Sequence, residues 1–381
     1  MKSSYEQYIY SKEMTLNIRK LRLPCKPDLG LYHFNILRLK SIGVSGDILA
    51  QGQIILSNCV ISTVIKFFKI PCPFKRFVVG NREIIKPRHV NDKNRYELGN
   101  TLYLTDKILM NPIYLTHHIT FAYNSRICTS AYESTISMCN PNRQLTLNEY
   151  LVSTNPNLKK FPQNAFRTDY MNHELDDIIR YLVVEHLDGD LEQWINFQLS
   201  AKQDIIIFDY KLLSMLIMIA YTLYVLDDHL QGFTHGDLGP RNILIQLIQP
   251  STNFWKYQIK SSQYNQNFYI MAQNAIPKLW DFSNTYIGNI QPEYYHYLSE
   301  TTLETMTPFI EDFSILFDKI HQMIYHTNTH ILPILESIIS IKQQYTNKEM
   351  AIKFLQHPWI MHYFTNVRIP DHQVEHLFSY G

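Results

Sequence analysis

The pattern of apolar and polar positions changes along the chain. Short runs rich in β-branched residues, including 53–56 and 61–68, predict a small antiparallel sheet in the first part. Residues 95–110 then carry leucine and isoleucine at partly helical spacing, which predicts one helix that packs on this sheet. A further strand is predicted at 179–184, and after Asp190 the pattern becomes largely helical. We therefore expect an α+β protein.

The most apolar run, 212–226, is interrupted by Ser214 and Thr222 and closed by Asp227 and Asp228. A membrane-spanning helix needs about 20 predominantly apolar residues, so this run is too short to span a bilayer. We interpret it as a buried helix.

Three other segments lack such patterning. Residues 1–36 have weak periodicity and are interpreted as an N-terminal extension or an extra helix. Residues 140–169 are rich in Asn, Pro and Thr, which predicts a loop insertion. Residues 249–273 are rich in Asn, Gln, Ser and Tyr, which favours a surface hairpin or mobile loop outside the core.

Composition narrows the function classes. The chain has 381 residues, of which 45% are hydrophobic, enough for one large or two medium domains. The 35 basic and 34 acidic residues nearly cancel, so charge indicates neither nucleic acid nor a membrane surface as a partner. Five scattered cysteines without zinc-site spacing favour a reducing compartment. The start of the chain lacks a signal-peptide pattern, so we expect a cytoplasmic protein, and nothing indicates an oligomeric state.

Two motifs carry candidate chemistry. Residues 235–242 read His-Gly-Asp-Leu-Gly-Pro-Arg-Asn, and an apolar run later ends at Asp281. Asp237 can accept a hydroxyl proton, while Asn242, five residues on, can turn back towards a metal ion. Asp281 supplies a second oxygen ligand of the kind that Mg²⁺ prefers. We expect Mg²⁺-dependent phosphoryl transfer, with Asn242 and Asp281 as the metal ligands.

These motifs resemble the H-R-D-x-x-x-x-N catalytic loop and the D-F-G metal motif of the protein-kinase superfamily. The resemblance covers roughly residues 37–362. It implies a bilobal protein-kinase-like fold with a small antiparallel-sheet N-lobe, 37–187, and a mainly helical C-lobe, 188–381. The segments 140–169 and 249–273 are then insertions in the two lobes, and ATP and Mg²⁺ are the implied cofactors.

The resemblance also implies phosphate-binding groups. The strand residues Thr63-Val64-Ile65-Lys66 resemble the V-A-I-K motif, so Lys66 would contact the α- and β-phosphates, with Lys69 as a competing candidate. Upstream lies a glycine turn that can approach phosphates through its backbone N–H groups. The residues of this turn are Gly43, Val44, Ser45 and Gly46.

Further residues complete the resemblance. Glu97 would hold Lys66 from the neighbouring helix, with Glu83 and Asp106 as competitors. Segment 183–191 resembles the hinge that binds adenine and ribose. Its candidate residues are Glu185, Leu187 and Asp190. Asp190 also suits the N-cap of the following helix, and the two roles are compatible.

Departures from the family pattern are informative. Gly236 replaces an arginine that in many kinases binds a phosphate on the activation loop, so loop phosphorylation is not expected as the switch. Gly239 occupies the place of the lysine that steadies the transferred phosphoryl group, and we assign that charge to Arg241 as a catalytic residue. Asp312 resembles the aspartate that holds the catalytic-loop backbone from below.

The substrate class follows from the same resemblance. Segment 354–360, with His-Pro-Trp at 357–359, resembles a helix boundary of protein kinases, which favours a protein substrate. The resembling family implies transfer to serine or threonine hydroxyls, although no motif in the sequence separates these from tyrosine. Two alternatives stay open: a small-molecule phosphotransferase of the aminoglycoside or choline kinase type, and a nucleotide-binding pseudokinase scaffold. The abundance of Ile, Asn, Tyr and Lys suggests an AT-rich genome, and divergent kinases of this style resemble those of large DNA viruses, which act in the host cytoplasm or the virion.

Overall fold

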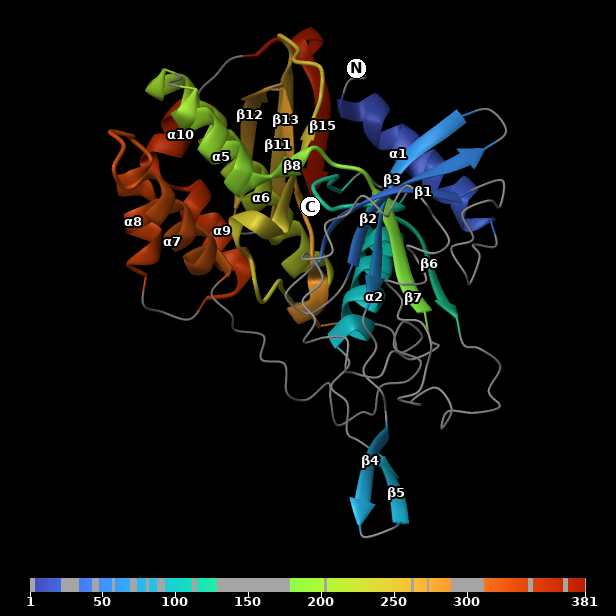
Figure 1. Ribbon diagram of the computed structural model, residues 1–381. Coiled ribbons are helices and arrows are strands. Elements are labelled where there is room, and N and C mark those ends of the chain that lie inside the picture. The colour runs from blue at the N-terminus through green and yellow to red at the C-terminus, as the bar shows by residue number, and fades with distance from the viewer. Residues whose placement is uncertain are drawn as a thin grey trace. The chain divides into compact units, whose positions relative to one another are not determined.

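The structure is a computed structural model of the chain. It describes residues 4–21, 34–42, 48–56, 59–68, 74–79, 82–87, 93–111, 115–128, 179–201, 204–261, 264–272, 274–288, 312–341, 345–365 and 369–380. The chain divides into two compact units (Figure 1). The smaller unit contains residues 14–98 and 122–186, and the larger unit contains 1–13, 99–121 and 187–381. The predicted lobe boundaries stay predictions, and the insertion at 140–169 lies outside the described residues.

The smaller unit is built on a five-stranded sheet in the order β1-β2-β3-β7-β6, with every pair of neighbours antiparallel. The strands are β1 (Phe34–Ile42), β2 (Ile48–Leu56), β3 (Cys59–Phe68), β6 (Ala122–Cys128) and β7 (Ile179–Glu185). Side chains alternate between the two faces of a strand, so Ile61, Thr63 and Ile65 share one buried face of β3. The predicted antiparallel sheet is confirmed.

Further elements of the N-terminal half are a helix α1 (Ser4–Arg19), a ribbon of β4 (Phe74–Val79) and β5 (Arg82–Pro87), and helix α2 (Lys93–Leu104) with a π-helical turn, η1 (Thr105–Leu109). The helix predicted at 95–110 is therefore confirmed. Within the smaller unit, Asn124 Nδ2 donates to the Ile18 carbonyl at 2.9 Å, which holds the end of α1 against β6.

The larger unit is organised around helix α6 (Ile205–His229), whose side chains from Leu212 to Asp227 are all buried. A helix enclosed by protein on all sides is apolar around its whole circumference. The prediction of a buried helix is confirmed, but its predicted extent, 212–226, was too short. Within the described part of the chain α6 is also the one helix long and apolar enough to cross a membrane, although 72% of its most apolar window is buried inside the protein.

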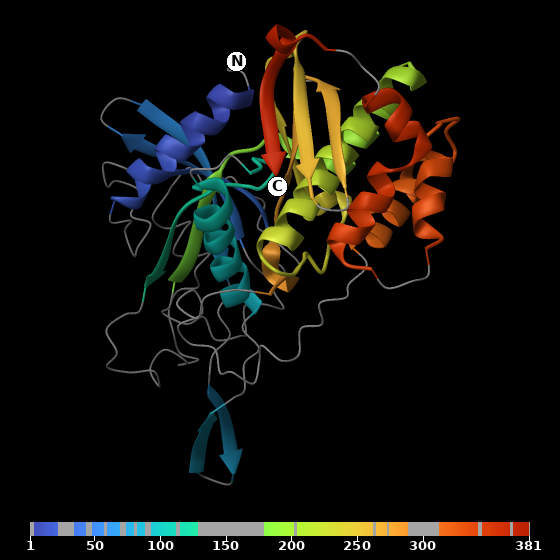
Figure 2. The same ribbon diagram turned by 180° about the vertical axis from the view of Figure 1, so that it is seen from behind.

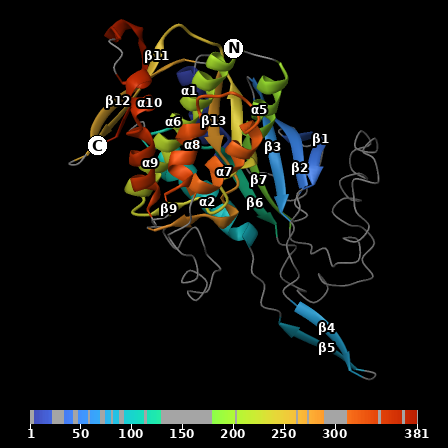
Figure 3. The same cartoon turned by 90° about the vertical axis from the view of Figure 1, so that its left-hand side faces the viewer.

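Five shorter helices are described in the C-terminal part of the larger unit, from residue 187 onward. They are α5 (Leu191–Ser200), α7 (Asp312–Ile324), α8 (Leu332–Ile339), α9 (Asn347–Leu355) and α10 (Pro358–Phe364). Helices α7 to α10 lie together in all three views (Figure 3). The largely helical pattern predicted after Asp190 is confirmed, with several short strands added.

A small antiparallel sheet positions the two predicted motifs. It contains β8 (Gly189–Asp190), β10 (Ile243–Leu247) and β13 (Ala275–Leu279), with β10 in the middle. The loop with Asp237 and Asn242 leads directly into β10, and Asp281 follows β13. Because Ile243 pairs with Leu279, the start of β10 and the end of β13 are neighbours. A shorter ribbon joins β9 (Phe233–Thr234) to β14 (Tyr286–Ile287).

The hairpin predicted at 249–273 is confirmed, but its expected location outside the core is wrong. The segment forms a hairpin of β11 (Phe254–Lys260) and β12 (Asn265–Met271), and β11 pairs in parallel with β15 (Val374–Tyr380) near the C-terminus (Figure 2). Trp255, Tyr257 and Phe268 are fully buried. Alternating inward positions on β11 carry the apolar side chains, so the polar composition of the whole segment concealed a strand with one buried face.

His118 is buried beneath this hairpin. Its Nδ1 atom lies 3.0 Å from the Pro277 carbonyl and its Nε2 atom 2.9 Å from the Tyr257 hydroxyl. We infer the neutral form, with Nδ1–H donating to Pro277 and Nε2 accepting from Tyr257. Burial lowers the pKa of His118 from 6.5 to about 3, against the opposing effect of the Pro277 hydrogen bond.

The buried His118 predicts acid-sensitive stability. Below pH 6.5 the unfolded chain protonates this histidine while the folded protein does not, so its contribution is complete above pH 6.5 and is lost as pH falls towards about 3. Between pH 7 and pH 5, His118→Gln should lose roughly 2 kcal/mol less unfolding free energy than wild type. Urea unfolding at both pH values checks this, with the exposed His372→Gln as control. If wild type, His118→Gln and His372→Gln lost equal unfolding free energy between pH 7 and pH 5, His118 would not be the cause of the acid sensitivity.

Candidate active site

The loop from His235 to Asn242 is held in part by hydrogen bonds between its own residues. The Gly239 N–H donates to the Asp237 carbonyl at 3.0 Å, and the Asn242 N–H donates to the Gly239 carbonyl at 2.9 Å. Asn242 Nδ2 also donates to the Asp237 carbonyl at 2.7 Å. These bonds fix the backbone on either side of the Asp237 carboxylate, which remains 51% exposed and can meet a substrate.

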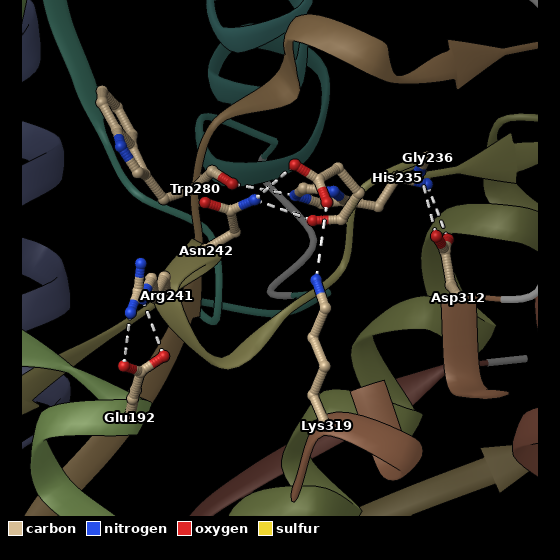
Figure 4. A network of polar contacts seen from close by, with 9 residues as sticks. Glu192, His235, Gly236, Arg241, Asn242, Trp280, Asp312 and Lys319 are labelled. Carbon is tan, nitrogen blue, oxygen red and sulfur yellow. Dashed lines mark hydrogen bonds and ion pairs between the residues drawn. The ribbon is translucent and has the colours of Figure 1, made fainter. Parts of the chain in front are cut away.

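Asp312, the first residue of α7, anchors this loop from the protein interior (Figure 4). Its carboxylate is fully buried and accepts from the His235 N–H at 2.7 Å, the Gly236 N–H at 2.9 Å and Asn347 Nδ2 at 2.8 Å. Burial raises the pKa of Asp312, while His235 and these donors lower it in part. The prediction that Asp312 holds the backbone of the loop at 235–242 is confirmed.

The local structure explains why position 236 is a glycine. Its φ is 80°, in the left-handed region, and a Cβ atom there would lie only 2.3 Å from the Asn284 carbonyl oxygen. A side chain therefore does not fit at this position without a shift of backbone. The arginine of the family motif is excluded by close contact between the loop and the segment after Asp281.

We expect Gly236→Ala to destabilise the larger unit by roughly 2 kcal/mol, because alanine resists the left-handed conformation and its Cβ displaces Asn284. Urea unfolding measures this loss. Gly189→Ala is the matched control, since its Cβ would meet only the flexible end of Gln193 at 3.0 Å. Equal stabilities for the two variants would contradict this account of Gly236.

Asp281 lies beside the loop in an uncommon conformation. Its φ of 62° and ψ of 70° are left-handed, and such backbone in a residue other than glycine often marks a functional site. The preceding Trp280 donates its N–H to the Asn242 carbonyl at 2.9 Å and accepts from His235 Nε2 at 2.8 Å. Two motifs distant in sequence are therefore brought together within one unit.

The segment after Asp281 is also held. Asn100 Nδ2 donates to the Phe282 carbonyl at 2.9 Å and to the Thr285 carbonyl at 3.2 Å. The Thr285 hydroxyl in turn donates to the His235 carbonyl at 3.1 Å. Hydrogen bonds thus connect the Asp281 segment both to Asn100 and to the loop at 235–242.

The donor set of Asn242 and Asp281 fits Mg²⁺. Because Nδ2 of Asn242 is directed to the Asp237 carbonyl, its amide oxygen is the atom that can face a cation. Carboxylate and amide oxygens are hard ligands, and Mg²⁺ binds through few protein groups while retaining several waters. Among the described residues, no group of three or more His, Cys, Asp and Glu could hold a metal ion.

Arg241, predicted as a catalytic residue, points to a different partner. Its Nε and Nη2 atoms each donate to Glu192 at 2.8 Å, and its side chain is 77% exposed. The Arg241 hydrogen bond lowers the pKa of Glu192. Among the described residues, the cation that pairs with Asp237 is instead Lys319 of α7, whose Nζ lies 3.7 Å from Asp237 Oδ1. Sequence reasoning missed Lys319, because no motif includes it.

The smaller unit contains the predicted lysine pair. Lys66 Nζ lies 2.6 Å from each Glu97 carboxylate oxygen, and the two side chains are 9% and 1% exposed. This confirms the pairing with Glu97, while Lys69 lies outside the described residues. Burying two charges is costly, and such pairs are weak evidence for stability. Because burial of this pair is costly, a functional role explains Lys66 better than a contribution to stability does.

The remaining predicted nucleotide residues are placed only in part. Glu185 ends β7 and is buried, as is Leu187. Asp190 caps α5 by accepting from the Gln193 N–H at 2.8 Å, which confirms its N-cap role, and burial raises its pKa. Adenine and ribose binding stay predictions. The turn Gly43, Val44, Ser45 and Gly46 lies outside the described residues.

Comparisons with known proteins give little support beyond the residues themselves. No protein-family model matches the chain, and no curated protein matches it. A solved structure described as a kinase domain aligns over 90% of this chain and 99% of its own, with a TM-score of 0.40 and 13% sequence identity. Similarity at this level carries no argument about function. The likeness to kinases of large DNA viruses stays a prediction, and the functional case depends on the site geometry.

Proposed function

We propose that the chain is an ATP- and Mg²⁺-dependent protein kinase that transfers the γ-phosphoryl group to serine or threonine hydroxyls. One observation supports this most strongly. Asp237, Asn242 and Asp281 are held beside one another in the larger unit by Asp312 and by the hydrogen bonds of Trp280. Neighbouring backbone segments therefore carry a half-exposed carboxylate and two candidate hard oxygen ligands, the groups that phosphoryl transfer uses.

Each residue has a distinct role in this proposal. Asp237 accepts the proton of the attacking hydroxyl, because its backbone is fixed and its carboxylate is accessible to substrate. Asn242 and Asp281 would hold Mg²⁺, which when bound neutralises charge on the phosphates. Lys66, oriented by Glu97, would bind the α- and β-phosphates.

Two observations bear on the acceptor. His357 caps α10 by accepting from the Trp359 N–H at 3.3 Å, so the His-Pro-Trp segment forms the helix boundary expected of a protein kinase. The loop letters His-Gly-Asp-Leu-x-Pro-x-Asn also occur in aminoglycoside and choline phosphotransferases, which makes a small-molecule kinase the second candidate. A pseudokinase scaffold would not need the full set of Lys66, Asp237, Asn242 and Asp281.

The acceptor is tested by incubation of the full chain with γ-labelled ATP and Mg²⁺. Casein-like proteins, aminoglycosides and choline, and buffer alone are compared as acceptors. We expect label on protein, at serine or threonine after acid hydrolysis. Label only on a small alcohol would favour the second candidate, and ATP binding without transfer to any acceptor would favour the scaffold.

A further inference from the structure

Lys319 occupies space that Gly239 leaves open. A Cβ atom at position 239 would lie 2.7 Å from Lys319 Nζ and 3.2 Å from its Cδ. Gly239 has a φ of −117° and a ψ of 167°, an extended conformation that any residue adopts. Its backbone therefore gives no reason for glycine. The contact that a side chain at position 239 would make first is with Lys319.

Helix α7 fixes the approach of Lys319 to the loop (Figure 4). Asp312, at the first position of α7, binds the loop backbone, and Lys319 follows it by seven residues. Positions seven apart are two turns along one face of a helix. The helix that anchors the loop therefore also delivers a cation to Asp237.

Charge distribution around the loop favours Lys319 over Arg241. The Arg241 guanidinium is bound by both oxygens of Glu192 on α5. Lys319 is 3.7 Å from Asp237 and its side chain is 48% exposed. An ion pair this long and this exposed is easily exchanged for another anion. A lysine ammonium is also a compact charge with three donors, which suits a phosphoryl oxygen.

We propose that Lys319 is the catalytic cation that contacts the transferred phosphoryl group, in place of the lysine absent at position 239. This inference rests on the proposed function. In the step, the acceptor O–H bond breaks and its proton passes to Asp237 while the acceptor oxygen bonds to the γ-phosphorus. The bond between the γ-phosphorus and the β–γ bridging oxygen breaks, and ADP leaves with that electron pair. Lys319 keeps its proton and stabilises the charge on the transferred group.

Moving the positive charge from position 319 to position 239 tests this role. We expect Lys319→Ala to lower kcat about 10²-fold, with little change in KM for ATP or in melting temperature. Arg241→Ala should cause a smaller loss, and the exposed Lys260→Met should behave as wild type. The double variant Gly239→Lys with Lys319→Ala places a lysine on the loop itself instead of on α7. Its kcat should be at least about tenfold higher than that of Lys319→Ala.

The outcomes separate this inference from the proposed function. An active wild type whose kcat is unchanged by Lys319→Ala would overturn the role of Lys319 alone. So would a loss in kcat that the double variant does not reverse while both proteins stay folded. A wild type without transfer to any acceptor would overturn the proposed function, and this inference with it.

Discussion

Asp237→Asn is expected to lower kcat by about 10² to 10⁴, the usual contribution of a positioned general base. The amide has the shape of the carboxylate but cannot accept the proton of the attacking hydroxyl. Asn242 is bonded mainly to the Asp237 backbone carbonyl, so the loop should keep its conformation. Initial rates with γ-labelled ATP measure the loss, and calorimetry with Mg-ADP should show nearly unchanged nucleotide affinity.

Asp371→Asn is the control for this variant, because Asp371 is an exposed aspartate of the same unit. It should keep wild-type kcat. If Asp237→Asn retained more than about a tenth of the wild-type kcat, proton acceptance by Asp237 would not be part of the reaction.

Asp312→Asn should cost about 3 to 5 kcal/mol of unfolding free energy, because it breaks a buried charged network. The variant replaces one acceptor oxygen by an NH₂ group that faces an N–H donor of His235, Gly236 or Asn347. A buried donor without an acceptor loses its hydration with no compensation. Urea unfolding measures the stability, and kcat should fall as well, because the loop that carries Asp237 loses its anchor.

Asp318→Asn is the matched control on the same helix. Asp318 is exposed and accepts from Gln322 Nε2 at 2.8 Å, so its change should stay within about 0.5 kcal/mol of wild type. Equal stability of the Asp312 and Asp318 variants would mean that the buried network does not hold the loop.

The loop at 235–242 was predictable as a candidate site because its polar side chains lie within eight consecutive residues. Asp237 and Asn242 belong to one turn, and Asp281 follows an apolar strand, so short-range patterns were sufficient. Asp312 was also predictable, from its resemblance to a residue with a known structural role. Glu97 was also selected over Glu83 and Asp106 from its place at the start of the predicted helix, and the ion pair with Lys66 confirms that selection.

Other features depend on long-range packing that no local pattern encodes. The approach of Lys319 to Gly239 depends on how α7 lies against the loop. The parallel pairing of β11 with β15 joins segments more than 100 residues apart, and parallel pairs carry no short turn signal. The overall composition of 249–273 is polar, which predicted a segment outside the core. Its buried face is visible only as the alternation of buried and less buried side chains along β11.

The most direct test is whether wild-type protein moves the γ-phosphoryl group of labelled ATP onto an acceptor hydroxyl, measured with Mg²⁺ and again after its removal by EDTA. We expect transfer with Mg²⁺ and none after chelation, because the proposed function assigns Mg²⁺ binding to Asn242 and Asp281. Transfer that continues at the same rate in EDTA, or ATP that binds but never reacts with Mg²⁺ present, would contradict the proposed function.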